Sequence, residues 1–157
     1  MSWSARLSEL GIRLPDVAAP VAAYIPAIRS GSHVFTSGQL PFVDGSLAAS
    51  GKVGAEVSPE EAKQYARVAA LNALAAVNGL VGIDAVVRVV KVTGFVASAE
   101  GFTGQPAVIN GASELLGEVF GEAGAHARSA VGVAELPLGA PVEVELVVEV
   151  ATTSGAA

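Results

Sequence analysis

Residues 126–150 read HARSAVGVAELPLGAPVEVELVVEV, and this stretch indicates two strands separated by a turn. Within 142–150, valine and leucine alternate with glutamate, interrupted only by Val147, which is typical of a strand with one buried face. The same period in 127–135 places Arg128 on one side with Ala130, Gly132 and Ala134. Residues 136–141, LPLGAP, have the proline and glycine content of a turn. The stretch therefore brings a lone arginine and a row of carboxylates to one sheet.

The rest of the chain divides into short elements with clear signals. Ser58-Pro59-Glu60-Glu61 combines an N-cap serine, a proline at the first helical position and a capping-box glutamate, so a helix begins there and runs to about residue 80. The β-branched run 86–97 predicts a strand. Apolar spacing predicts a second long helix over 105–122. We also expect a short helix at 5–10, extended runs at 24–29 and 33–37 joined by a turn at 29–32, and a short strand around Leu47.

This order of elements predicts a single α+β domain spanning residues 1–157. Two long helices can cover only one face of the sheet. We expect the uncovered face to carry Arg128 and the row that contains Glu143, and to meet water or another subunit. The hydrophobic fraction of 52% and the mean hydropathy of +0.55 favour a homo-oligomer that packs through its sheets.

Composition argues against several classes of function. The net charge is −6 and no two adjacent residues are basic, so the phosphate backbone of a nucleic acid is a poor partner. No cysteine is present, which removes disulfides and thiolate chemistry. No apolar run approaches the roughly 20 residues of a membrane span, and residues 1–16 do not resemble a signal peptide. We therefore expect a cytoplasmic protein with no membrane partner.

Known catalytic motifs are missing from the sequence. It has no GxGxxG after a strand, no P-loop and no GxSxG, and its two histidines are too few for a histidine-rich zinc site. The polar candidates that remain are Arg128, Glu143, Tyr24, Ser37, the backbone at Gly38, and Asn110.

Each leading candidate admits two interpretations. Arg128 among small residues suits a bidentate clamp for a small carboxylate, but a structural ion pair with a strand glutamate fits the pattern equally well. Glu143 is either a base that orients water or one carboxylate on a solvated strand face. Tyr24 fits a half-buried strand aromatic, His33 a strand surface residue, and Asn110 an exposed helix amide that faces away from the apolar stripe.

Three blocks of residues resemble the Rid family, the YjgF or reactive-intermediate deaminase group formerly labelled L-PSP endoribonucleases. They are Tyr24 followed by TSGQLP at 36–41, Asn110 in the second long helix, and the run from Arg128 to Glu143. Together the blocks span most of residues 15–151. The sequence departs from the family pattern at Ala130, where a cysteine is common, and at Ile25-Pro26, where Ser-Gln is common. The spacing between the second helix and Arg128 also differs, which indicates a divergent subgroup.

The resemblance implies a chorismate-mutase-like fold assembled as a homotrimer with clefts between subunits. It also implies hydrolysis of small 2-imino acids to 2-keto acids and ammonia, without a metal or organic cofactor. Arg128 would bind the substrate carboxylate and Glu143 would activate water. Tyr24, Ser37, Gly38, Asn110 and Ala130 would line the substrate-binding cleft. A non-catalytic small-acid-binding or regulatory protein is the alternative, and the acidic composition argues against a ribonuclease.

Overall fold

The computed structural model describes residues 1–20 and 23–152 of the chain, and within them it shows an α+β fold. The strands of the main sheet are β1 (Ala27–Ser30), β2 (His33–Thr36), β5 (Val86–Ala97), β6 (Ala127–Val133) and β7 (Val142–Val150). The helices are α1 (Trp3–Glu9), α2 (Pro59–Val81) and α3 (Gln105–Phe120), with 3₁₀ turns at Ile83–Ala85, Gly121–Gly124 and Pro137–Gly139. A small two-stranded sheet joins β3 (Phe42–Val43) to β4 (Ser46–Leu47).

The five-stranded sheet has the order β1-β2-β7-β5-β6, and only the β5–β6 pair is parallel. β5 therefore lies between the two strands that the C-terminal stretch predicted. The predicted strand at 86–97 is confirmed at both ends. The helix predicted at 58–80 is also confirmed, with the Ser58 side chain accepting a hydrogen bond from the Glu61 amide. The first extended run is shifted: β1 begins at Ala27, and Tyr24 lies in a bend before it.

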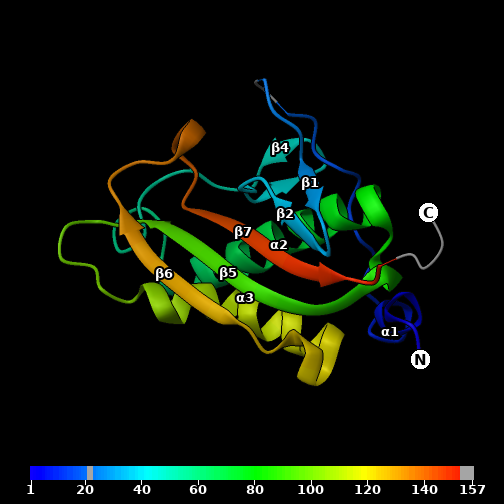
Figure 1. Ribbon diagram of the computed structural model, residues 1–157. Helices are drawn as coiled ribbons and strands as arrows, with labels where there is room; N and C mark the ends of the chain where they lie inside the picture. The colour runs from blue at the N-terminus through cyan, green and yellow to red at the C-terminus, as the bar shows by residue number, and fades with distance from the viewer. Residues whose placement is uncertain (21–22, 153–157) are drawn as a thin grey trace.

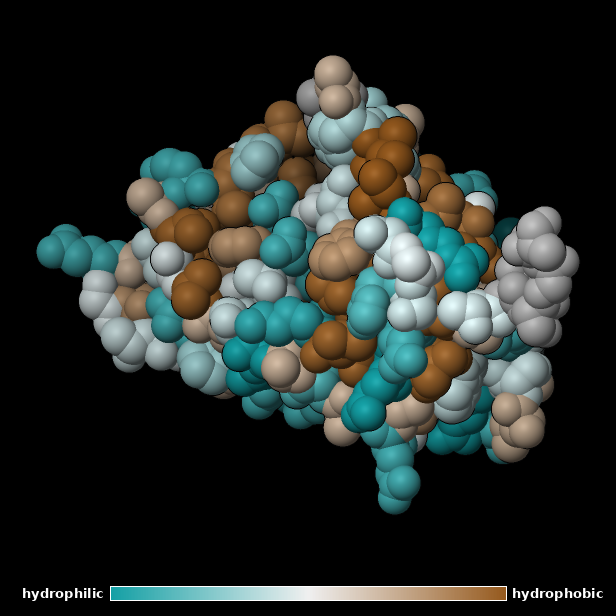
Figure 2. Space-filling view, viewed as in Figure 1, coloured by the Kyte–Doolittle hydropathy of each residue, from teal (hydrophilic) through white to brown (hydrophobic). Residues whose placement is uncertain are grey.

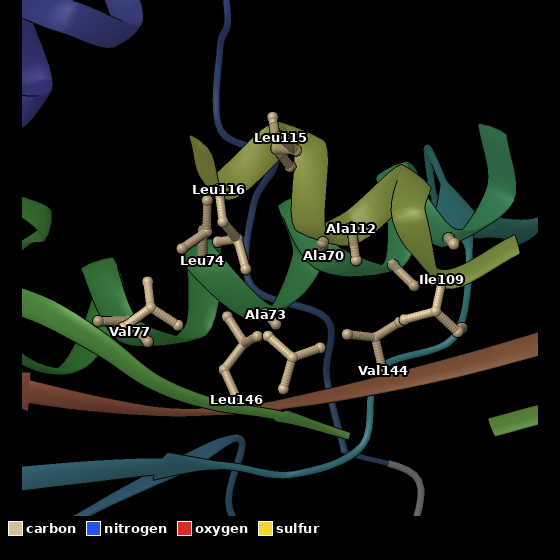
Figure 3. Close-up of a cluster of buried hydrophobic side chains, with 14 of the residues drawn as sticks. Ala70, Ala73, Leu74, Val77, Ile109, Ala112, Leu115, Leu116, Val144 and Leu146 are labelled. Atoms are coloured by element: carbon tan, nitrogen blue, oxygen red, sulfur yellow. The ribbon is translucent and has the colours of Figure 1, made fainter. Parts of the chain in front are cut away.

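Helices α2 and α3 lie on one side of the sheet, as the sequence predicted (Figure 1). The core forms between these helices and the sheet face that contains Val144 and Leu146 (Figure 3). The alanines of α2 allow this close packing, since each has almost no exposed surface: Ala62, Ala66, Ala69, Ala70, Ala73 and Ala76. No helix of the described residues is long and apolar enough to span a bilayer.

The opposite face of the sheet, which we call the open face, has none of the described helices over its strands (Figure 1). Register and burial assign Ile28, Phe35, Val147, Phe95 and Val131 to this face. Polar side chains share it, including Glu143, Glu145 and Glu149. Figure 2 shows apolar and polar atoms mixed over the side of the molecule turned to the viewer.

Helices α2 and α3 pack tightly against each other at Gly111. A Cβ atom at this position would overlap the backbone carbonyl of Lys63, which cannot rotate out of the way. Gly111→Ala should therefore lower the free energy of unfolding by about 2 kcal/mol, measured by urea denaturation. Gly117→Ala is the matched control on the same helix, because nothing lies within 4 Å of its Cβ. The free energy of unfolding of Gly117→Ala should rise by up to about 1 kcal/mol, because alanine has the higher helix propensity. Equal changes in the free energy of unfolding at Gly111 and Gly117 would contradict the packing argument.

Candidate active site

Arg128 lies on the helix-covered side of edge strand β6. Its register partner on β5 is Val92, which is fully buried against the helices, and Ala130 and Gly132 follow it on the same side. The prediction that Arg128 occupies the open face was therefore wrong. Arg128, Ala130 and Gly132 do share one side of the strand, as the alternation predicts. Periodicity alone does not say which of the two sides meets the helices. Because β6 is at the sheet edge, Arg128 is only half-buried.

Helix α3 holds the Arg128 guanidinium through two neutral acceptors. Arg128 Nη1 donates to Asn110 Oδ1 at 2.7 Å and to Ser113 Oγ at 3.2 Å. Gly94 of β5 lets α3 lie close to the sheet. A Cβ atom at Gly94 would lie 2.5 Å from Ile109, the neighbour of Asn110 on α3. The expectation that Asn110 is an exposed amide was wrong, since its side chain faces β6 and is half-buried.

Arg128 does not form the structural ion pair that the sequence left open. Among the residues that the structure describes, the salt bridges involve Arg6, Lys52, Lys63 and Arg67, and Arg128 pairs with no carboxylate. Its charge is therefore positioned by neutral groups but is not neutralised by them. We call Arg128 with Asn110, Ser113 and Ala130 the arginine half-site.

Glu143 lies on the open face of β7, opposite Phe95 of β5, and is half-buried. Burial raises the pKa of the Glu143 carboxyl above its ordinary value, and the charge of Glu145 raises this pKa further. The Glu143 side chain lies directly over the backbone of Gly38, where a Cβ atom would be 2.7 Å from its Cδ. A carboxylate with a raised pKa on a partly exposed surface suits general-base chemistry better than a fully solvated one.

Ser37, which precedes Gly38, is hydrogen-bonded to the segment that follows Tyr24. The Ser37 hydroxyl donates to the Ile25 carbonyl at 2.6 Å, and the Ser37 amide donates to the Pro26 carbonyl at 2.8 Å. Tyr24 is 46% exposed, so it is available to a ligand or to another subunit. We call Glu143 with Ser37, Gly38 and Tyr24 the glutamate half-site.

The two half-sites do not meet within one chain. Arg128 and Glu143 lie on opposite faces of the sheet, with β5 between their strands. Two shallow surface hollows of about 190 and 260 Å³ lie beside α1 and between α2 and α3, and neither is lined by these residues. Within residues 1–20 and 23–152, no group of three or more His, Asp or Glu side chains could hold a metal ion.

Comparison with known proteins identifies the family of this chain. A family model described as "YjgF/chorismate_mutase-like, putative endoribonuclease" matches residues 4–150. The chain belongs to the YjgF/chorismate-mutase-like family. This confirms the resemblance to the Rid family that the sequence motifs indicated.

Several relatives of this YjgF-family chain match over nearly its full length. Protein TCP17 of Trypanosoma cruzi is 46% identical over 93% of this chain and 92% of its own. A crystal structure from Agrobacterium tumefaciens, of a protein of unknown function, is 43% identical with a TM-score of 0.87, covering 95% of this chain and 92% of that one. A structure from Shewanella oneidensis, described as a "putative endoribonuclease", is 33% identical with a TM-score of 0.92, covering 96% of this chain and 100% of that one.

Two polar residues of this YjgF-family chain lie at the candidate site but were not predicted from the sequence. Ser113 and His126 contact each other beside Arg128, with Ser113 Oγ and His126 Nε2 2.9 Å apart. Their spacing could have indicated this: Ser113 follows Asn110 by three residues on a helix, and His126 precedes Arg128 by two residues next to a strand. Each pair therefore points to the same side of its element.

Proposed function

We propose that this protein hydrolyses small 2-imino acids to 2-keto acids and ammonia, in a cleft between two copies of the chain. The observation that carries the proposal is the unpaired charge of Arg128 in the described structure. Nη1 is held by Asn110 and Ser113, while the edge formed by Nε and Nη2 has no partner among the described residues. A carboxylate can accept two parallel hydrogen bonds from that edge.

A second copy of the chain is needed to bring the glutamate half-site to Arg128, because one chain keeps them on opposite faces of its sheet. The open face supplies apolar contact area for such an assembly, since Phe35 and Val131 are 45% and 43% exposed there. The family resemblance leads us to propose a homotrimer. In a closed ring each cleft combines the arginine half-site of one copy with the glutamate half-site of the next.

The proposed reaction needs no nucleophilic side chain. Arg128 binds the substrate carboxylate, and the protonated imine carbon is already electrophilic. Glu143 accepts a proton from water as its oxygen bonds to that carbon, which gives a carbinolamine. Glu143 passes this proton to the amine nitrogen and becomes a carboxylate again. The C–N bond then breaks and ammonia leaves, while the hydroxyl group gives its proton to the Glu143 carboxylate and the C=O bond forms. Positioning of the acid and of one water provides most of the rate gain.

The alternative that uses the same cleft is a non-catalytic module that binds a 2-keto acid, because the arginine half-site can bind a carboxylate without help from Glu143. A ribonuclease fits less well. The net charge is −6, and Glu143, Glu145 and Glu149 form an acidic row on the open face, which would repel phosphates.

The deciding experiment generates 2-iminopropanoate and 2-iminobutanoate in solution with an amino acid oxidase and follows the release of ammonia. We expect the purified protein to increase the rate in proportion to its concentration. Saturable binding of 2-oxobutanoate with no gain in rate would favour the binding module. If the protein shows no binding of 2-oxobutanoate and no gain in rate, both proposals are overturned.

A further inference from the structure

A directed chain of hydrogen bonds leads from the backbone of Gly124 to the guanidinium of Arg128. His126 Nδ1 lies 2.6 Å from the Gly124 carbonyl oxygen, and His126 Nε2 lies 2.9 Å from Ser113 Oγ. Arg128 Nη1 then donates to Ser113 Oγ at 3.2 Å. Ser113 lies on α3, Gly124 ends the 3₁₀ turn Gly121–Gly124, and Arg128 lies on β6, while His126 lies in the short connection before β6.

With a neutral His126, the chemistry of the two ends sets the direction of every bond in this chain. A carbonyl oxygen can only accept, so His126 Nδ1 carries the hydrogen that Gly124 receives. In the neutral imidazole Nε2 is then an acceptor, and the Ser113 hydroxyl donates to it. Arginine can only donate, and it uses the remaining acceptor capacity of Ser113. Every group fills a role that its chemistry allows, and Ser113 fills two, as donor to His126 and as acceptor from Arg128.

The far end of the chain is rigid. Gly124 is buried, and a Cβ atom there would overlap the carbonyl oxygen of Leu116 on α3. The Gly124 backbone is therefore packed directly on the helix that also carries Asn110 and Ser113. A hydrogen bond to this carbonyl fixes the plane of the imidazole, which in turn fixes the Ser113 hydroxyl.

We infer that Ser113 and His126 are positioning residues for Arg128. With Asn110 they hold Nη1 toward α3, so the Nε–Nη2 edge, which has no partner among the described residues, keeps one orientation. This inference rests on the proposed role of Arg128 as a carboxylate anchor and extends it to two residues that do not touch the substrate. A bidentate contact gains most from such a fixed orientation, because both of its bonds must align together.

Two measurements on Ser113 variants test the inference. The first is binding of 2-oxobutanoate and of its neutral amide, 2-oxobutanamide, by calorimetry. Ser113→Ala should weaken binding of the acid by about tenfold, the size expected for one hydrogen bond to a charged group, and leave binding of the amide unchanged. Ser113→Thr keeps the hydroxyl and should bind the acid within about twofold of wild type. In an Arg128→Ala background, Ser113→Ala should have no further effect.

The second measurement needs no ligand. In ¹⁵N NMR spectra, the side-chain NH₂ groups of Arg128, assigned by comparison with Arg128→Lys, should be distinct in the wild type and merge in Ser113→Ala and His126→Ala as rotation is freed. A purely structural role for Ser113 predicts equal losses for acid and amide, and unchanged Arg128 signals, and would overturn the inference. If wild type neither binds a 2-keto acid nor releases ammonia from an imine, the proposed function fails, and the NMR result still decides whether Arg128 is positioned.

Discussion

Arg128→Ala should reduce kcat/KM for 2-iminobutanoate by about a thousandfold. The variant removes both hydrogen bonds to the substrate carboxylate and the positive charge that they carry. Two charge-assisted bonds together contribute about 4 kcal/mol, and each 1.4 kcal/mol corresponds to about a tenfold change in rate. The rate of ammonia release, measured at several substrate concentrations, gives this ratio directly.

Arg128→Lys separates charge from geometry in the same assay. Lysine keeps the positive charge but cannot form two parallel bonds, so it should recover only part of the lost activity. Arg13 is an exposed arginine that lies far from Arg128 in the sequence. Arg13→Ala is therefore the control, and its rate of ammonia release should equal that of wild type. Wild-type activity in Arg128→Ala would eliminate the carboxylate-anchor role.

Glu143→Gln should lower kcat by about a hundredfold, the usual contribution of a positioned general base. Only the ionised carboxyl can accept a proton from water, so activity should fall as the pH is lowered through the pKa of Glu143. Burial and Glu145 raise this pKa, and the fall should therefore be centred above the ordinary glutamate value of 4.5. Glu145→Gln removes the second cause and should shift the centre of the fall to lower pH. A pH profile that Glu145→Gln leaves unchanged would contradict the assignment.

Loss of activity in Glu143→Gln should not reflect loss of folding. The folded state has the higher pKa, so it holds the proton more tightly than the unfolded chain, and stability decreases as pH rises from the ordinary pKa through the raised one. At pH 7 the ionised Glu143 is therefore unfavourable, and glutamine removes that cost. Thermal unfolding should show a variant at least as stable as wild type at pH 7, with any gain vanishing below about pH 4.

Local signals in the sequence predicted most of the fold. Residues 86–97 form a strand with the predicted ends, and Ser58 caps α2, because β-branched runs and capping boxes act over a few residues. The order of the strands in the sheet could not be predicted from such local signals. β5 lies between β6 and β7 through pairings that join residues far apart in the sequence, and no local pattern encodes them.

The sequence predicted most residues of the candidate site, but neither Ser113 nor the arrangement of the site. Arg128 and Glu143 were selected from the strand pattern and the family motifs, and they were expected to share a face. The structure separates them because the side of β6 that carries Arg128 meets α3. Asn110 was predicted to be an exposed amide, but it accepts a hydrogen bond from Arg128 for the same reason. At the edge of the sheet, α3 buries polar residues that lie beside its apolar stripe.

The most direct test of the shared cleft is to mix the two inactive variants. Arg128→Ala and Glu143→Gln chains are co-expressed in equal amounts with different tags, and the mixed assemblies are assayed for ammonia release. In randomly assembled rings, about a quarter of the clefts receive an intact Arg128 from one copy and an intact Glu143 from the next. We therefore expect about a quarter of wild-type activity, against almost none for either variant alone. Mixed assemblies that remain as inactive as the single variants would contradict a cleft built from two copies.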